Sequence, residues 1–196
     1  ELWRWGTWNS TRIGHWRLVP SPTVGSGVIL ACGPKDAPVY AVKAGGTGTL
    51  SHKSLAWQSH VQATDDAAEA APSQNIRELT TDVPTPLFYE VRFYILNGRK
   101  RKLYCVNPAD GAVVWSGDLG SKSDYQCSPT AADGKIYVMN FNADVSVIQA
   151  GGSEFKLLHT ANFKDDGDAT RHRSSVAISQ GNLFLRTGTK LFALGK

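Results

Sequence analysis

Short apolar runs, separated by turns and polar stretches, recur four times along the 196-residue chain. The turn positions are Gly27, Val91, Gly134 and Gly181, which are 64, 43 and 47 residues apart. Each is followed by a run of alternating or wholly apolar residues that is typical of a strand and too short for a helix. A repeat of roughly 40 to 50 residues is typical of propeller blades. The pattern predicts an all-β chain that forms a β-propeller of about four blades.

The closing run of each copy is the most distinctive part of the repeat. It ends in tryptophan in Leu55–Trp57 and Val113–Trp115, whereas the third copy ends in Leu157–His159. A buried indole removes about 150 to 250 Å² from water and still needs an acceptor for its N–H, so it suits the seam between two blades. We therefore expect Trp57 and Trp115 to dock one blade on the next.

The fourth copy ends with the run Leu191–Leu194 and lacks a closing run. At the other end of the chain, Glu1–Trp3 has the same apolar and then tryptophan ending. We expect Glu1–Trp5 to pair with Leu191–Leu194, to complete the last blade and to close the ring, with Trp3 as a third docking tryptophan. Two alternatives stay open. In the first, the chain is a segment of a larger ring of about seven or eight blades. In the second, two copies associate by exchanging end strands.

We expect residues 1–196 to form a single propeller domain, which the repeat divides into blades. The expected boundaries are about 20–60 for blade 1, an insertion at 59–81, about 83–119 for blade 2, about 125–161 for blade 3, and about 173–196 together with 1–5 for blade 4. The dipeptides Asn97–Gly98, Asp110–Gly111 and Asp133–Gly134 predict tight turns with positive φ angles. Within the insertion, Asp65–Ala71 is predicted as a loop or a short helix.

The segment Leu103–Trp115, with the sequence LYCVNPADGAVVW, resembles the repeat of pyrroloquinoline-quinone-type (PQQ-like) propellers. In that family a strand leads into an Asp or Asn, a turn with Gly, and a strand that ends in Trp. Val91 in place of the turn glycine and His159 in place of the tryptophan depart from the pattern. The resemblance implies a bacterial, extracytoplasmic protein, because the family includes outer-membrane assembly scaffolds. We expect a noncatalytic scaffold that binds a protein or a small ligand.

The alternative that the resemblance implies is a quinoprotein oxidoreductase, or a fragment of one, that holds PQQ with calcium on the propeller axis. Many such enzymes place adjacent cysteines against the quinone, and Cys32, Cys105 and Cys127 are far apart in this chain. No set of Glu, Asn and Asp can be matched to the calcium ligands, so no catalytic residue, metal ligand or cofactor is predicted. The cysteines have no C-x-x-C spacing and are expected to be buried as small apolar side chains.

Two connections are candidate partner-binding surfaces, since long loops on repeat scaffolds often carry function. One is the insertion. The other is Gly6–Val19, a basic and aromatic stretch with the candidate binding residues Trp8, Arg12, His15, Trp16 and Arg17.

Charge changes this picture little. The net charge of +4 and the run Arg99–Lys102 are compatible with nucleic-acid binding, but the run is expected at a hairpin tip in solvent, so nucleic acid is disfavoured. Asp165, Asp166 and Asp168 lack the spacing of a calcium loop. No apolar stretch approaches the roughly 20 residues that span a membrane.

Overall fold

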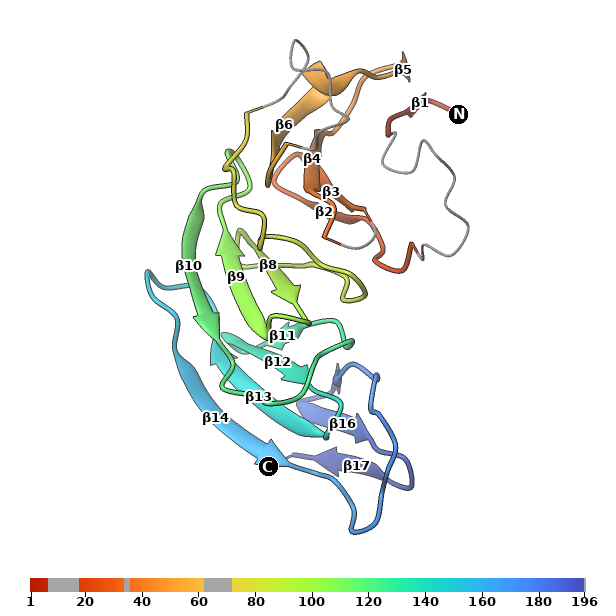
Figure 1. Ribbon diagram of the computed structural model, residues 1–196, viewed down its shortest axis with the longest axis vertical. Helices are drawn as coiled ribbons and strands as arrows, with labels where there is room; N and C mark the ends of the chain where they lie inside the picture. Colours follow the sequence, from red (N-terminus) through yellow and green to blue (C-terminus); the bar gives the residue numbers. More distant parts are fainter. Residues whose placement is uncertain (7–17, 34–35, 62–71, 196) are drawn as a thin grey trace.

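The computed structural model describes residues 1–6, 18–33, 36–61 and 72–195. Four antiparallel sheets follow one another along the chain as an arc that is open on one side (Figure 1). The prediction of an all-β fold built from four blades is confirmed.

Each sheet is a blade of up to four strands in simple up-and-down order. Blade 1 contains β2 (Thr23–Gly25), β3 (Val28–Cys32), β4 (Val39–Lys43) and β6 (Leu55–Gln58). Blade 2 contains β7 (Leu87–Tyr89), β8 (Arg92–Asn97), β9 (Lys102–Val106) and β10 (Val113–Asp118). Blade 3 contains β11 (Thr130–Ala132), β12 (Lys135–Met139), β13 (Asp144–Gln149) and β14 (Leu157–Asn162). Blade 4 contains β15 (Ala177–Ser179), β16 (Asn182–Arg186) and β17 (Leu191–Leu194). A 3-10 turn, η1 (His52–Ser54), precedes β6.

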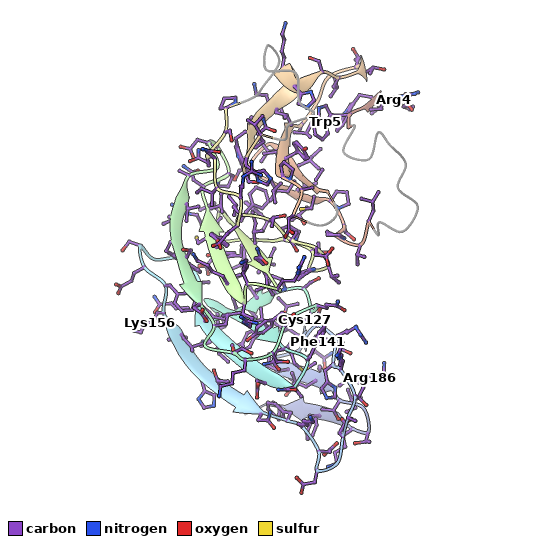
Figure 2. All side chains as sticks on the ribbon, in the orientation of Figure 1. Arg4, Trp5, Cys127, Phe141, Lys156 and Arg186 are labelled. Atoms are coloured by element: carbon purple, nitrogen blue, oxygen red, sulfur yellow. The ribbon has the colours of Figure 1, made fainter. Side chains whose placement is uncertain are left out.

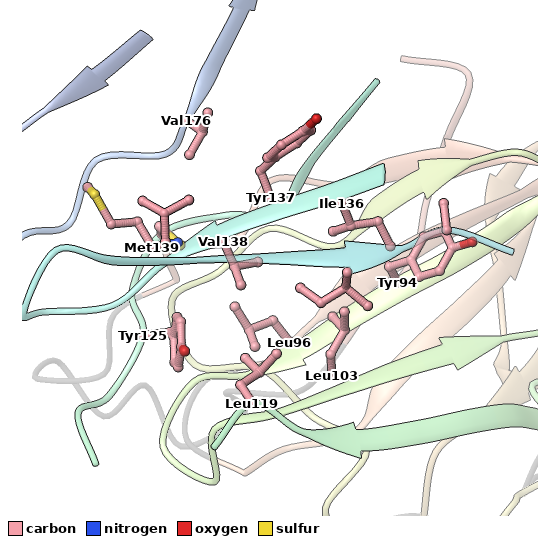
Figure 3. Packing of buried hydrophobic residues seen from close by; sticks show 14 of the residues in the cluster. Tyr94, Leu96, Leu103, Leu119, Tyr125, Ile136, Tyr137, Val138, Met139 and Val176 are labelled. Carbon is pink, nitrogen blue, oxygen red and sulfur yellow. The ribbon is translucent and has the colours of Figure 1, made fainter. Parts of the chain in front are cut away.

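The core lies between the blades because successive side chains of a strand point to opposite faces. In β8, Phe93 and Ile95 pack with blade 1, whereas Tyr94 and Leu96 pack with blade 3. Figure 3 shows the second of these seams, where residues of β8, β9 and β12 interlock. The middle strands of blades 2 and 3 are therefore apolar on both faces, which explains their nearly continuous apolar runs.

The N-terminal strand β1 (Trp3–Arg4) does not complete blade 4, so that prediction is wrong. It pairs in parallel with β5 (Gly48–Thr49), which belongs to the β4–β6 connection. There Trp3 and Trp5 pack against Tyr40 and Val42 of blade 1. Among the described residues no other blade packs on this face of blade 1. Packing β1 here removes apolar surface from water without the strand having to cross the opening of the arc. In the described part of the chain, β17 is left as the edge of a three-stranded blade.

The closing strands share one geometry. In each, a bulge precedes the residue at the docking position, which pairs as Trp57 with Ala41, Trp115 with Cys105, and His159 with Val147. The Trp57 indole Nε1–H donates to the Pro108 carbonyl of blade 2 over 2.8 Å, and the Trp115 Nε1–H donates to the Gly151 carbonyl of blade 3 over 2.9 Å. His159 is exposed. Two indoles thus link successive blades.

A second link runs along the residues that precede the first strands. The backbone N–H of Ser21 donates to the hydroxyl of Thr85 over 3.0 Å. The Thr85 N–H donates to the Ser128 hydroxyl, and the Ser128 N–H donates to the Ser175 hydroxyl, each over 2.9 Å. We call this series the hydroxyl ladder. One equivalent hydrogen bond therefore joins each blade to the next.

The tight turns between first and second strands repeat as well. Both central residues have positive φ in all four blades, at Ser26–Gly27, Glu90–Val91, Asp133–Gly134 and Gln180–Gly181. The prediction for Asp133–Gly134 is confirmed, and Gly111 also has positive φ. The prediction for Asn97–Gly98 is wrong, because the positive φ of that connection lies at Arg101. Gly98 is instead required by space, since a Cβ there would meet the Tyr125 carbonyl oxygen at 1.9 Å.

All three cysteines are buried, as expected, and the structure shows that all three thiols are free. Burial raises the pKa of Cys32 to about 12 and that of Cys127 to about 12. It raises the pKa of Cys105 to about 11. At neutral pH all three therefore remain neutral thiols within the packed core.

Candidate functional site: an arginine and phenylalanine surface

The candidate binding residues of the first loop, Trp8, Arg12, His15, Trp16 and Arg17, lie outside the described residues. The same holds for the predicted helix at 65–71. The described remainder of the insertion lies along the edge of β6, where Gln58 bridges to Ser73 and Gln74 bonds to the Asp110 carbonyl. This part of the insertion therefore covers the outer strand of blade 1.

The basic run Arg99–Lys102 covers the β8–β9 connection and the first residue of β9. Each of its cations faces an acidic side chain. Arg99 lies 3.5 Å from Asp36, and Arg101 lies 3.1 Å from Asp124. Lys100 and Lys102 approach opposite oxygens of Glu78 at 3.9 and 3.8 Å. These pairs are largely exposed and contribute little to stability, but they compensate the positive charge of the run.

A different basic group gathers around Phe141, in the β12–β13 connection (labelled in Figure 2). The guanidinium carbons of Arg171 and Arg173 lie 5.8 and 5.4 Å from the centroid of the Phe141 ring. The Phe141 N–H donates to the Asp124 carbonyl, and its own carbonyl accepts from the His172 N–H. The Arg173 Nε–H also donates to Gln126 over 2.8 Å. The ring and two exposed arginines are thus held in a fixed arrangement, which we call the Arg–Phe surface.

His172 anchors the segment between the two arginines. Its side chain is 2% exposed, and its Nε2 lies 3.4 Å from Asp168 Oδ2, whose side chain is 4% exposed. His172 is buried between Arg171 and Arg173, which are both exposed. Hydrogen bonds from Thr170, together with the nearby His172, lower the pKa of Asp168. Asp168 therefore remains a carboxylate at neutral pH.

The other acidic residue of this loop is also engaged. Asp165 accepts hydrogen bonds from Thr187 and Thr189 and pairs with the Lys190 ammonium. The Lys190 and Thr189 donors lower the pKa of the Asp165 carboxyl. Asp165 thus ties the β14–β15 loop to the β16–β17 connection of blade 4, whereas Asp168 holds the loop together from within. Among the described residues, no group of three or more His, Cys, Asp and Glu side chains is placed to hold a metal ion.

Two hollows open beside Phe141 and share Asp124 as a wall. The smaller, of about 40 Å³, lies between blades 2 and 3 and includes Arg99 and Gln126. The larger, of about 420 Å³, lies beside the loop that leads to blade 4 and includes Lys122, Lys164 and Arg171. The Arg–Phe surface therefore presents an aromatic face, guanidinium donors and concave space in one place. Such a surface suits a ligand that carries carboxylate groups, which guanidinium forks bind through paired hydrogen bonds.

A hollow of about 730 Å³ lies at the other end of blades 3 and 4, between Tyr137 and Leu194. At the preceding seam, the Tyr94 hydroxyl, which is equivalent to that of Tyr137, accepts from the Gly151 N–H in the β13–β14 connection. The hollow lies at the level where, at the preceding seam, the β13–β14 connection packs against Tyr94.

Sequence reasoning did not find the Arg–Phe surface. Phe141 and Arg171 are 30 positions apart, and only the seam between blades 3 and 4 brings them together. The alternation Arg171–His172–Arg173 was the available signal, because an extended segment with a buried middle residue presents its two neighbours on one side.

Cys32, Cys105 and Cys127 lie on separate elements and are buried by apolar neighbours, so they do not form the pair of adjacent cysteines that many PQQ-like quinoproteins place against the quinone. Their side chains fill the seams between blades.

Comparison with known proteins agrees with the geometry. Residues 35–195 match the family model described as outer membrane protein assembly factor BamB, a PQQ-repeat family. The chain belongs to this family. No curated protein matches it significantly.

Solved structures of BamB-like folds resemble the chain at low sequence identity. BamB from Moraxella catarrhalis matches with a TM-score of 0.58 and 10% identity, over 89% of this chain and 44% of that one. The chain therefore spans less than half of that protein. The computationally designed Ika4 protein matches with a TM-score of 0.61 and 10% identity, over 100% and 98% of the two chains. A europium-containing methanol dehydrogenase matches with a TM-score of 0.51 and 11% identity, over 76% and 25%. These likenesses show a shared propeller fold.

No helix among the described residues is long and apolar enough to cross a membrane.

Proposed function

We propose that this PQQ-repeat chain is a noncatalytic, extracytoplasmic scaffold that binds a carboxylate-bearing segment of a partner protein at the Arg–Phe surface. The observation that supports this role is the placement of Arg171 and Arg173 over Phe141, in an arrangement held by the backbone and by buried His172. Rigid cations and a rigid ring bind at a low cost in conformational entropy. The extracytoplasmic location rests on family membership alone.

A protein segment fits this surface better than a nucleic acid does. A nucleic-acid backbone repeats its negative charge at short intervals and is bound by extended rows of cations. Here Asp124 forms part of both hollows, and Arg99 and Arg101 already face acidic groups. Mixed charge of this kind favours a short acidic segment with an apolar residue that can lie against Phe141.

Fluorescence anisotropy with labelled peptides tests the proposal. The probes are a peptide that alternates glutamate with leucine, a lysine–leucine peptide and single-stranded oligo-dT. We expect only the acidic peptide to bind, and we expect the double variant Arg171→Ala/Arg173→Ala to lose at least about tenfold in affinity, which corresponds to about 1.4 kcal/mol. The matched control removes two exposed cations elsewhere, as Arg77→Ala/Lys156→Ala, and should bind like the parent chain.

Equal loss in both double variants would mean that only net charge matters, and it would overturn the assignment of the site. Preferential binding of oligo-dT would replace the proposal with nucleic-acid recognition. For the quinoprotein alternative, the chain is mixed with PQQ and calcium. A rise in melting temperature together with dye-linked alcohol oxidation would overturn the noncatalytic role.

A further inference from the structure

A buried pair of ionisable side chains lies in the loop that carries the two arginines of the Arg–Phe surface. His172 Nε2 and Asp168 Oδ2 face each other at 3.4 Å, and the two side chains are 2% and 4% exposed. Neither atom has a hydrogen-bond partner among the described residues. A buried carboxylate oxygen without a donor costs free energy, because it gives up water and gains no hydrogen bond in exchange. Protonation makes both imidazole nitrogens donors, so a proton added to His172 lets these two atoms bond to each other.

The preceding seam shows that packing at this position does not need a group that titrates near neutral pH. Tyr125 and His172 both stand three residues before a serine of the hydroxyl ladder. Their backbone N–H groups donate over 3.1 Å to the preceding blade, Tyr125 to the Gly98 carbonyl and His172 to the Phe141 carbonyl. Both side chains are buried. Burial raises the pKa of Tyr125, which therefore stays neutral, whereas histidine is the side chain whose charge ordinarily changes between about pH 5 and 8.

Asp168 supplies the negative charge of the pair. Its Oδ1 accepts from the Thr170 N–H over 2.8 Å, and hydrogen bonds from Thr170 lower the pKa of the carboxyl. Gly188, in the β16–β17 connection, packs against the carboxylate, since a Cβ there would lie 2.9 Å from Asp168 Oδ2. The carboxylate is therefore present near neutral pH and is shielded from water on this side.

The other charged groups on the elements around the pair are carboxylates, ammonium groups and guanidinium groups. They are Lys164, Asp165, Asp166, Arg171 and Arg173 in the same loop, Lys190 in the β16–β17 connection, and Arg101, Lys122 and Asp124 on the side of blades 2 and 3. Asp165 pairs with Lys190, and Asp124 pairs with Arg101. Groups of these kinds ordinarily keep their charge between about pH 5.5 and 8. His172 is therefore the member of this set that can respond to pH in that range.

We propose that protonation of His172 strengthens the binding of a carboxylate-bearing segment at the Arg–Phe surface, so that the scaffold holds its partner more tightly in mildly acidic surroundings. This regulation rests on the function proposed above for that surface. With a neutral imidazole, the buried pair carries the full negative charge of Asp168 close to Arg171 and Arg173. Protonation brings the pair to zero charge and removes its repulsion of an incoming carboxylate. By linkage, a bound acidic segment favours the protonated imidazole to the same extent.

Fluorescence anisotropy with the glutamate–leucine peptide at about pH 5.5 and pH 8 tests the regulation. One unit of charge acting over several ångströms near a protein surface should give about threefold to tenfold tighter binding at the lower pH. The glutamates of the peptide stay ionised, since their ordinary pKa is about 4.3. The matched control is His159→Gln, which removes an exposed histidine of β14 and should keep the parent response.

Two variants hold the charge of the buried pair in opposite states. His172→Gln leaves the Asp168 carboxylate uncompensated at every pH, so it should bind at both pH values as weakly as the parent does at pH 8. Asp168→Asn removes the buried charge, so it should bind at both pH values as tightly as the parent does at pH 5.5. A purely structural role of the pair would instead weaken binding in both variants.

Calorimetry of the parent chain supplies a test that needs no variant to fold. At about pH 6.5, binding of the peptide should take up protons, seen as a binding enthalpy that differs between two buffers of different ionisation enthalpy. Binding of equal affinity at both pH values without proton uptake, or an unchanged pH response in His172→Gln, would overturn the regulation and leave the proposed function standing. Absence of peptide binding at either pH would overturn both.

Discussion

The indole of Trp57 occupies the space directly above Gly111 in the next blade. A Cβ on Gly111 would lie 2.5 Å from the Trp57 ring, and the φ of Gly111 is +76°. Gly111 of the Asp110–Gly111 turn in blade 2 and Trp57 of the closing strand of blade 1 are therefore the two sides of one contact between neighbouring blades. At the next seam, Trp115 packs instead against Phe155, with ring centroids 5.7 Å apart.

Replacing Gly111 with alanine should destabilise the chain by about 2 to 4 kcal/mol, because strain at positive φ and overpacking both contribute. The matched control is Gly134→Ala. Gly134 also has positive φ, at +66°, but no atom lies within 4 Å of the added Cβ, so this variant should lose only about 1 kcal/mol. Urea unfolding measures both. Equal losses would show that the Trp57 ring moves aside at no cost.

Trp57→Phe should cost about 2 to 4 kcal/mol in urea unfolding, since it leaves the Pro108 carbonyl without its donor and shrinks a fully buried side chain. His159 occupies the equivalent position of blade 3 and is exposed. His159→Phe should change stability by less than about 0.5 kcal/mol. A small effect of Trp57→Phe would mean that this indole does not fasten blade 1 to blade 2.

Val91→Gly should stabilise the chain by about 1 kcal/mol, seen as a higher melting temperature. Val91 has φ of +57°, where the other three blades carry glycine. Relief of about 1 to 2 kcal/mol of backbone strain exceeds the larger entropy of glycine in the unfolded chain. The reciprocal variant Gly134→Val should be destabilised. A lower melting temperature for Val91→Gly would contradict the strain at this turn.

Asp168→Asn should reduce the loss of stability in acid. The pKa of Asp168 is lowered in the folded chain, so its carboxylate stabilises the fold above the unfolded pKa of about 3.9, and this contribution is lost as pH falls through the folded value. Urea unfolding between about pH 3 and pH 6 should therefore give a flatter profile for the variant. The matched control is Asp166→Asn, which removes an exposed carboxylate from the same loop. Parallel profiles for Asp168→Asn and the parent would refute the role given to this carboxylate.

The sequence predicts the blades well because their determinants are local. Alternation within β8 and β9, glycine at Gly134 and the closing tryptophans all depend on neighbours a few positions away. The position of β1 could not be predicted in the same way. The pattern identifies Leu2 and Trp3 as a closing strand, but it does not determine on which face of the arc that strand packs. In the structure the strand packs on the nearer face, with Tyr40 and Val42.

The Arg–Phe surface was missed for a related reason. Phe141 belongs to a turn within blade 3, and Arg171 and Arg173 belong to the loop before blade 4, so their contact depends on how two sheets stack. The positive φ expected at Gly98 was wrong because a glycine before a basic run looks like a turn residue, whereas its real constraint is the Tyr125 carbonyl of a distant loop.

The burial of Cys32, Cys105 and Cys127 has a consequence for how the chain would mature in an oxidising compartment. Thiols with a strongly raised pKa are almost never thiolates, so oxidants and disulfide-exchange enzymes have little to attack once folding is complete. The hazard is confined to the unfolded chain, in which the same three thiols are exposed and reactive. Rapid closure of the blades would then be the chain's own protection against mispaired cross-links.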